Sequence, residues 1–465
     1  MNPPPRPPAA RISLVGVTLL LLALPLAAAD SLNWDALNNR VDADIRTWDL
    51  RQLLDSIAAQ SGWEIFVQPD AKQPISAKFK NLSPGEALKK LLTELNFAVS
   101  TPTNAAPRLF IFRTKRDEAT QKISPPAVRK QSQALGNEVV VLLQPGANGS
   151  KLAAALGANI KGKITGANAF RFAFDSEAEA ASARQSLADR DDVLGLDSNF
   201  AIDRPRISEI PAPAAPLPFS LRPTLGPDGG TVIIGLVDTA VQREGTQIGA
   251  FLLSPIAVAG AAEVPQSQPT HSTSMAENIL RTIAASQSAN SSPVRILPVD
   301  VYGNRETTTT FDIANGISQA VKGGARLINL SLGSHGDSTL LHTVIKNSTD
   351  QGVVFFAAAG NEPTTAPFFP AAYSEVTAVT AGEKNGTLAT YANRGNFVDV
   401  VASGTSLVQF NNQGWVITGT SSAAAAATGY AASLVAHGGK TASEAQALVR
   451  SRWSAGTVVG NLGQN

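Results

Sequence analysis

The stretch Thr231-Val-Ile-Ile-Gly-Leu-Val-Asp238 decides the fold, because it is an apolar run that ends abruptly in a carboxylate. Similar runs, largely apolar and separated by helix-like segments, follow at residues 294–302, 325–332 and 353–359. A strand that is apolar on both faces is typical of a parallel sheet that helices cover on each side. The alternation from residue 231 to residue 452 therefore predicts an α/β domain built on such a sheet.

Polar side chains stand where these predicted strands end. Asp238 closes the first run, and Ser331 and Asn361 fall at or just past the ends of two later ones. His271 opens a helix-like stretch, and Ser421 lies at the start of a run of small residues. In open parallel sheets, functional groups gather at the carboxyl ends of the strands. We therefore expect these side chains to converge at one edge of the sheet.

Three of these residues can supply the parts of a nucleophilic catalyst. A serine hydroxyl attacks a carbonyl only when a base takes its proton, and a carboxylate keeps that base in the correct tautomer and orientation. Asp238, His271 and Ser421 provide a carboxylate, an imidazole and a hydroxyl, in that order along the chain. Taken singly, each has a structural alternative: a helix cap, a packed histidine, or a serine that caps an alanine-rich helix.

The sequences around these residues resemble the signature blocks of the subtilisin-like serine proteases, the subtilases of peptidase family S8. The matching stretches are Gly235-Leu-Val-Asp-Thr-Ala240, Thr270-His-Ser-Thr-Ser-Met-Ala276, Val353-Val-Phe-Phe-Ala-Ala-Ala-Gly-Asn-Glu362 and Gly419-Thr-Ser421. The resemblance implies a subtilisin-like fold for residues 231–465. It also implies catalytic roles, with Ser421 as nucleophile, His271 as base, Asp238 as its orienting carboxylate and Asn361 as an amide donor to the oxyanion.

Three residues beside these positions depart from the family pattern. Ala240, Ser272 and Ala425 stand where the family has glycine, glycine and proline. The resemblance implies a serine endopeptidase that forms an acyl-enzyme. Departures of this kind also mark relatives that have lost turnover, so an inactive subtilase-like module that binds proteins in the cell envelope stays as the alternative.

The stretch Ile328-Asn-Leu-Ser-Leu-Gly333 resembles the family's substrate strand, whose backbone pairs with an extended peptide. The expected substrate-binding residues are all uncharged: Ser331, Leu332, Gly333, Ala359 and Gly360. Uncharged pocket walls favour an apolar or neutral residue before the scissile bond. The opposite wall of the cleft is expected from residues 303–310, where Thr307-Thr-Thr-Thr310 takes the place of the usual glycines.

Residues 137–203 show the order strand, helix, strand, helix, strand. Directly upstream of a protease-like domain, this order resembles the propeptides of subtilases. The resemblance implies a small α+β domain that assists folding, packs on the catalytic domain and inhibits it with its tail, at residues 198–203. A free ferredoxin-like binding domain is the alternative. The proline-rich residues 204–230 predict an exposed linker, with maturation between about residues 202 and 230.

Residues 30–113 predict another small α/β domain, in which Ser83-Pro-Gly-Glu86 has the cap, the early proline and the glutamate of a helix start. The pattern resembles the short N-terminal domain of secretins and TonB-linked receptors, which implies a protein partner in the envelope. An α/β pro-segment of no particular kind is the alternative. Residues 114–136 predict a linker, because they are charged, then rich in proline and glutamine, and show no sustained period.

The first 29 residues predict a secretory signal peptide. Arg6 and Arg11 precede an apolar run at residues 12–26, and Ala27-Ala-Ala29 offers a cleavage site. A retained signal anchor is the alternative. We expect an exported protein, in the periplasm or outside the cell.

Composition argues against several other classes of function. Lys and Arg number 38 against 37 Asp and Glu, so the basic surplus that nucleic-acid binding needs is missing. The absence of cysteine excludes disulfides, thiol nucleophiles and cysteine-based zinc sites, and the four histidines lack paired zinc-ligand spacing. The expected partners are polypeptide substrates, and no cofactor is required. Calcium is frequent in the resembled family, but no dense acidic run places a site for it.

Overall fold

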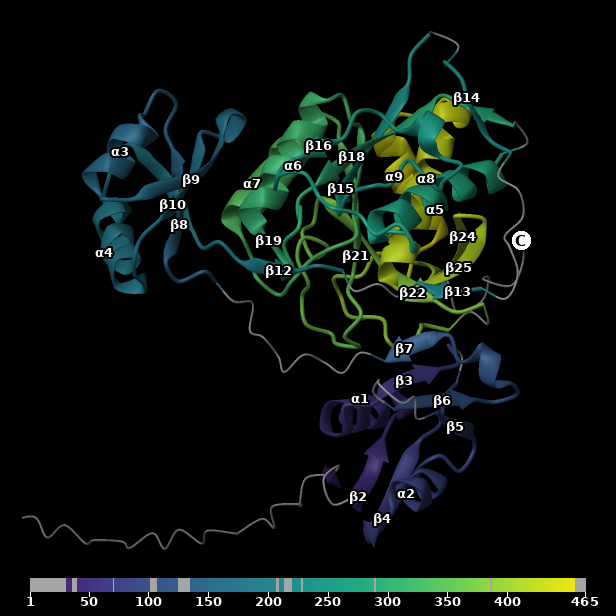
Figure 1. Cartoon of the computed structure of the whole chain (residues 1–465). Helices are drawn as coiled ribbons and strands as arrows, with labels where there is room; N and C mark the ends of the chain where they lie inside the picture. The colour runs from purple at the N-terminus through teal and green to yellow at the C-terminus, as the bar shows by residue number, and fades with distance from the viewer. Residues whose placement is uncertain are drawn as a thin grey trace, which may run out of the picture.

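The computed structural model describes residues 31–455, except 36–39, 70, 101–106, 124–133, 206–208, 213–219, 227–228, 288–289 and 385–386. The expected signal peptide, parts of both expected linkers and the last ten residues therefore lie outside the described residues. Three bodies follow one another along the chain (Figure 1).

The largest body contains the predicted parallel sheet, which is confirmed. Its strands are β15 (Val232–Asp238), β16 (Ile256–Ala257), β18 (Val294–Asp300), β20 (Leu327–Leu330), β21 (Val354–Ala358), β22 (Val376–Gly382) and β23 (Val400–Ser403). They stand in the order β16-β18-β15-β20-β21-β22-β23, and every neighbouring pair is parallel. The order places β15, β20 and β21 side by side at the centre, so the residues at their carboxyl ends are neighbours.

Helices cover both faces of this sheet, as Figure 1 shows. One layer contains α5 (His271–Ala285), α8 (Thr420–Gly438) and α9 (Ala442–Arg452), and the other contains α6 (Thr310–Lys322) and α7 (Thr339–Thr349). Alternate residues of β15 pack into two hydrophobic cores, one under each helix layer. Ile234 and Leu236 belong to the first core, and Val237 belongs to the second. Burial on both faces is the reason that the strand is apolar throughout.

The alanine-rich helix α8 runs through the centre of this body, close to α5. A Cβ placed on Gly429 would lie 2.5 Å from the carbonyl oxygen of Ile279 in α5. Only small side chains allow two helices to approach so closely, and Ala423, Ala424 and Ala425 are completely buried. This packing explains the run of small residues after Ser421. The hairpin of β24 (Thr405–Phe410) and β25 (Gln413–Thr418) leads directly into α8.

The second body is a four-stranded antiparallel sheet with two helices. It contains β8 (Glu138–Leu143), α3 (Gly149–Ala155), β9 (Asn159–Ile164), the short 3₁₀ helix η2 (Thr165–Ala167), β10 (Ala169–Ala173), α4 (Glu177–Ala188) and β11 (Val193–Asp197). The strand order is β11-β8-β10-β9. Strand β9 was not among the elements expected from the sequence, because its residues Asn-Ile-Lys-Gly-Lys-Ile are mostly exposed and show no apolar run.

Short stretches of the segment after this body pair with the large body, including parts of residues 204–230, which were expected to be an exposed linker. Strand β12 (Ala201–Asp203) pairs with β19 (Thr307–Thr309), and β13 (Ile210–Pro211) pairs with β25. Strand β14 (Arg222–Pro223) pairs with β17 (Ser291–Ser292). The residues between the prolines keep their N–H groups and so can still join a sheet edge.

The first body has two small sheets. One contains β1 (Ser31–Asp35), β2 (Arg40–Trp48) and β4 (Ile75–Leu82), and the other contains β3 (Glu64–Val67), β5 (Asn96–Ser100), β6 (Arg108–Phe112) and β7 (Gln121–Ile123). Helices α1 (Leu50–Ser61) and α2 (Pro84–Leu91) both begin with a capping box, and Ser83 is the cap of α2. The 3₁₀ helix η1 (Arg116–Glu118) and strand β7 lie in the segment predicted as a linker, where β7 pairs with β3.

Within the described part of the chain, none of the helices combines the length and the apolar character that a membrane span requires.

Candidate active site

Asp238 is the last residue of β15, and its side chain is completely buried. One carboxylate oxygen, Oδ1, accepts a hydrogen bond from the backbone N–H of Thr239 at 2.6 Å. Within the described part of the chain, the remaining hydrogen bonds of the carboxylate go to a single side chain, the imidazole of His271. Its Nδ1 lies 3.0 Å from Oδ1 and 2.8 Å from Oδ2.

His271 is the first residue of α5, and the N-cap Thr270 accepts from the N–H of Thr273. The contact with the carboxylate stabilises the tautomer that carries its proton on Nδ1, which leaves Nε2 as the basic nitrogen. Burial is the largest influence on the pKa of His271 and acts to lower it. The charges of Asp238 and Glu209 outweigh burial, so the pKa of His271 lies above its usual value.

Ser421 is the second residue of α8, where the helix N-terminus favours negative charge. Its hydroxyl donates to the carbonyl oxygen of Ser331 at 3.4 Å. Among the described residues, no hydrogen bond joins Ser421 to His271. The structure therefore brings Ser421 to the end of β20, and it holds the pair of Asp238 and His271 as a separate contact.

Asn361 follows β21, and its side chain is hydrogen-bonded to the start of α8, the helix that carries Ser421. Its Oδ1 accepts from both the N–H and the hydroxyl of Thr420, each at 2.9 Å. With the oxygen engaged in this way, the Nδ2 group is the part of the amide that can donate elsewhere. A Cβ placed on Gly419 would lie 3.3 Å from Asn361 Nδ2 and 3.8 Å from the backbone nitrogen of Ser421. The two donors therefore border one small space beside Gly419.

The expected substrate strand is held by tight packing. Ser331, Leu332 and Ala359 are buried, with at most 4 % of each residue exposed. A Cβ on Gly333 would come within 2.6 Å of both the Phe368 ring and the carbonyl oxygen of Phe369. Gly360 has φ +103°, a conformation that favours glycine, and a Cβ there would collide with Asn393. Both glycines are thus required by their surroundings.

The three departures from the expected pattern fit without displacing the imidazole. Ser272 is completely buried, and its N–H donates to the Thr239 hydroxyl at 3.2 Å. The carbonyl oxygen of Ala240 accepts from the Thr270 hydroxyl at 2.7 Å. Ala425 packs in the core. The contact between His271 and Asp238 is intact beside them.

Glu209 is a residue of this site that sequence reasoning missed. Only 8 % of it is exposed, and neither carboxylate oxygen has a hydrogen-bond partner in the described part of the chain. Burial is the main cause that raises the pKa of Glu209, and the His271 charge opposes it. Ser274 also lowers this pKa, although its hydroxyl does not reach hydrogen-bond geometry. Nothing in the proline-rich sequence signals this placement, which follows from the pairing of β13 with β25.

Within the described residues, no group of three or more His, Asp or Glu side chains gathers in the manner of a metal site. The residues described above can serve proton transfer: a buried carboxylate, an imidazole, and a hydroxyl at a helix N-terminus with two nearby N–H donors.

Comparison with known proteins gives the family of the large body. Residues 229–460 match the model of the Subtilase family. Thermitase of Thermoactinomyces vulgaris is 31 % identical over 231 residues, which cover 48 % of this chain and 81 % of thermitase. A thermophilic serine proteinase of Bacillus sp. strain AK1 is 36 % identical over 165 residues, which cover 34 % of this chain and only 41 % of that proteinase.

Solved structures agree on the fold alone. The epidermin leader peptide processing serine protease of Staphylococcus aureus, solved as a mutant, superposes with a TM-score of 0.53 at 15 % identity, over 67 % of this chain and 92 % of that one. Fervidolysin of Fervidobacterium pennivorans gives a TM-score of 0.52 at 18 % identity, over 64 % of this chain and 54 % of that one.

Proposed function

The chain belongs to the subtilase family of serine endopeptidases, and from this premise we propose that it cleaves polypeptides through Asp238, His271 and Ser421 and is made as an exported proenzyme. The observation that carries the proposal is the paired contact of His271 Nδ1 with both carboxylate oxygens of Asp238, at 3.0 and 2.8 Å. A buried carboxylate that orients an imidazole in this way prepares Nε2 to take a proton.

The reaction follows from the positions of these groups. His271 Nε2 takes the proton of the Ser421 hydroxyl while Oγ attacks the scissile carbonyl carbon. The carbonyl oxygen, now negative, accepts hydrogen bonds from Asn361 Nδ2 and the Ser421 N–H. The C–N bond breaks as His271 returns its proton to the leaving amine, and an acyl-enzyme remains. Water then adds with His271 as base, and the released acid regenerates Ser421.

One local change precedes the first step. The Ser421 hydroxyl donates to Ser331 in this structure, so it turns about χ1 toward His271 before it loses its proton. The contact that it leaves is long, at 3.4 Å, and therefore weak. The loss of this weak contact costs little.

The proenzyme part of the proposal is supported by how residues 137–203 dock on the catalytic body. Asp197 Oδ2 accepts from the Ser338 hydroxyl at 2.6 Å and from the Leu340 N–H at 2.9 Å, at the start of α7. Asn199 Oδ1 accepts from the Phe311 N–H at 3.1 Å, at the start of α6. These contacts and the pairing of β12 with β19, in the segment predicted as a cleft wall, support a propeptide whose tail acts as an intramolecular inhibitor.

We also propose that the first body binds a protein partner in the cell envelope. Residues 31–123 form their own hydrophobic core, which includes Trp34, Leu53 and Ile65. We assign these residues to docking on a protein partner of the envelope, and peptide cleavage to the large body.

A fluorophosphonate probe tests the catalytic assignment. We expect covalent labelling of the matured wild-type protein on Ser421, and none of Ser421→Ala. A matched control is Ser422→Ala, which removes the neighbouring hydroxyl and leaves the nucleophile in place; it should be labelled. If matured wild-type protein stays unlabelled, the chain is instead an inactive module that binds proteins.

A further inference from the structure

The tail of the docked body lies against residues 303–309, the segment expected to form a wall of the cleft, and presents two side chains to it. Strand β12 runs antiparallel to β19, with Ile202 opposite Thr308. The pairing continues past the strand, because the Arg204 N–H donates to the carbonyl oxygen of Glu306 at 2.8 Å. An extended peptide bound in this register turns alternate residues the same way, so Ile202 and Arg204 face the protein together.

Ile202 fills an apolar site. It is 1 % exposed and belongs to the hydrophobic cluster that also contains Tyr302, Phe311 and Leu332. The intervening Asp203 is exposed, and its carbonyl oxygen accepts from the Tyr302 hydroxyl at 3.1 Å. The backbone of residue 203 is therefore held while its side chain lies exposed.

Arg204 is bound through two nitrogens of its guanidinium group, Nε and Nη2. Nη2 donates to the carbonyl oxygen of Gly303 at 2.6 Å and to that of Arg305 at 2.9 Å, and Nε donates to the latter at 3.1 Å. The group also lies over the ring of Tyr302, with Cζ 5.3 Å from the ring centroid. Two carbonyl oxygens and an aromatic face match a planar cation with several donors, and they match an ammonium group less well.

A buried carboxylate lies behind this site. Asp300 is 4 % exposed; its Oδ1 accepts from the N–H groups of Tyr302 and Gly303, at 2.9 and 3.0 Å. Its Oδ2 is buried and has no hydrogen-bond partner among the described residues. Burial raises the pKa of Asp300, and the positive charge of Arg204 lowers it. The guanidinium group of Arg204 is thus attracted by a carboxylate whose second oxygen has no hydrogen-bond partner among the described residues.

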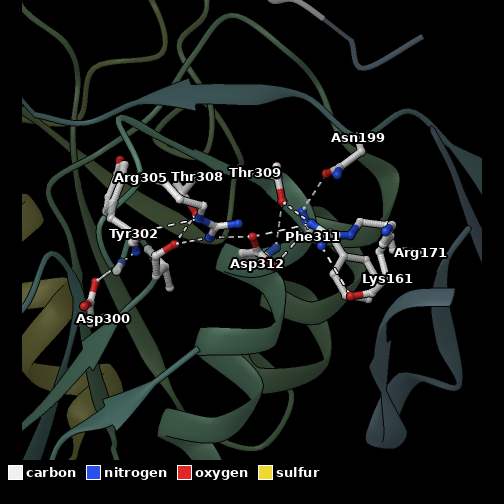
Figure 2. A network of polar contacts seen from close by, with 12 residues as sticks. Lys161, Arg171, Asn199, Asp300, Tyr302, Arg305, Thr308, Thr309, Phe311 and Asp312 are labelled. Atoms are coloured by element: carbon white, nitrogen blue, oxygen red, sulfur yellow. Dashed lines mark hydrogen bonds and ion pairs between the residues drawn. The ribbon is translucent and has the colours of Figure 1, made fainter. Parts of the chain in front are cut away.

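A second cation beside this site, Arg305, is paired with another carboxylate. Arg305 presents its carbonyl oxygen to Arg204, while its own guanidinium pairs with Asp312 at 2.9 Å (Figure 2). The carbonyl oxygen of Gly303 is fixed by the backbone, because Gly303 has φ +57° and a Cβ there would lie 2.6 Å from the carbonyl oxygen of Ala259. The carbonyl groups and the ring that contact Arg204 all belong to the catalytic body.

From these contacts we propose that Asp300, Tyr302 and the carbonyl groups of residues 303 and 305 form an arginine-binding subsite of the cleft. The substrate class is polypeptides with an aliphatic residue followed two positions later by arginine. The inference rests on the proposed function, because it treats the docked tail as a stand-in for a substrate. It goes beyond the uncharged pocket walls expected from the sequence, which concern a different part of the cleft.

The first experiment needs no catalysis. In the uncleaved Ser421→Ala chain, hydrogen exchange at the amides of residues 202 and 204 reports how tightly the tail is held. We expect Arg204→Gln to raise these exchange rates about tenfold. Arg204→Lys should raise them less, since lysine keeps the positive charge but lacks the planar set of N–H donors of the guanidinium group. The matched control is Arg222→Gln, which changes an exposed arginine of the same segment and should leave the rates unchanged.

A second pair of variants tests the carboxylate. In the Asp300→Asn background, Arg204→Gln should raise the exchange rates by a clearly smaller factor than in the parent. The reason is that the positive charge of Arg204 has no carboxylate to attract it there, so less is lost when the charge is removed. Equal factors in the two backgrounds would remove Asp300 from the subsite. If Arg204→Gln leaves exchange within twofold of the parent chain, the whole subsite is overturned.

The last experiment uses the matured wild-type chain and a pair of fluorogenic peptides containing Ile-Asp-Arg or Ile-Asp-citrulline. Citrulline keeps the shape of arginine and removes its charge. We expect kcat/KM to be at least tenfold higher for the arginine peptide. Equal cleavage of both peptides contradicts the subsite and leaves the peptidase proposal standing. Loss of all hydrolysis contradicts the peptidase proposal, while the exchange experiment still decides the subsite.

Discussion

At the scale of single residues, the site depends on one buried carboxylate–imidazole pair and on what surrounds it. Asp238 is completely buried, and His271 is 5 % exposed. Charges in such a place interact strongly, because little water screens them. The orientation of the imidazole is therefore set by the carboxylate, and the pKa of the imidazole responds to every charge placed near it.

The substitution Asp238→Asn tests the orienting role. The amide keeps the size of the side chain but favours the wrong tautomer of His271, so we expect kcat to fall roughly 10⁴-fold with little change in KM. Steady-state cleavage of a peptide by matured enzyme measures the loss, and circular dichroism checks that the fold is kept. A fall in kcat of less than tenfold would show that the carboxylate does not orient the base.

Glu209 predicts a pH effect on self-cleavage. His271 must be neutral to accept a proton, and the charge of Glu209 helps to raise its pKa. Removing that charge with Glu209→Gln lowers the pKa of His271, so the acid limb of the self-cleavage rate should move to lower pH. The rate of self-cleavage between about pH 5 and pH 9 measures the shift. The exposed Glu244→Gln serves as control, and an unmoved limb for Glu209→Gln would contradict the coupling.

The residue scale also shows what sequence could and could not predict. Asp238, His271, Asn361 and Ser421 were candidates because each sits in a short motif of characteristic composition. Their catalytic roles stay predictions. Glu209 and Arg204 carry no motif, because their importance comes from a backbone path that brings a distant segment against the site.

At the scale of elements, the strands of the large body were predictable and several edge strands were not. A central strand buries both faces, so its apolar run is visible in the sequence. Strands β12, β13 and β7 are two or three residues long and gain their partners from far along the chain. No local pattern distinguishes such segments from loops, and β9 shows the same problem in an exposed strand.

The start of helix α7 offers a test at the scale of elements. Asp197, which is 6 % exposed, caps the start of α7 from another domain. Replacement by alanine leaves the Leu340 N–H without its acceptor, which costs about 1–2 kcal/mol. In the uncleaved Ser421→Ala chain, we expect hydrogen exchange at that amide to become roughly 5- to 30-fold faster.

The control for this prediction is Asp192→Ala, on the same domain. Asp192 pairs with Arg190 at the surface, where ion pairs contribute little. Its loss should leave the Leu340 amide as protected as before. Equal exchange for Asp197→Ala and the parent chain would mean that the cap does not hold the two bodies together.

At the scale of the whole molecule, the three bodies differ in how closely they pack on one another. The large body and the docked second body share one hydrophobic cluster, which contains Val140 and Leu142 together with Phe311 and Leu341. The first body has a separate core. Between the described residues of the first body and the large one, Lys72 donates to the Thr387 hydroxyl at 3.0 Å.

Maturation is the prediction for the whole molecule. We expect active protein to begin at a residue between about 202 and 230, and Ser421→Ala to keep the longer chain. N-terminal sequencing of the secreted products measures both. Active wild-type protein that always begins at Asp30 would contradict the proenzyme, although it would leave the catalytic assignment intact.

The unbroken course of the chain from β11 through β12 to β13 has a kinetic consequence. While the chain is whole, the tail competes for the cleft at a local concentration fixed by its tether, and no free peptide in dilute solution can match it. A single cut turns the same contacts into an ordinary encounter between two molecules, whose occupancy falls as the solution is diluted. Freshly cut enzyme should therefore become active after a lag that shortens on dilution, so that release into a large volume itself acts as the trigger.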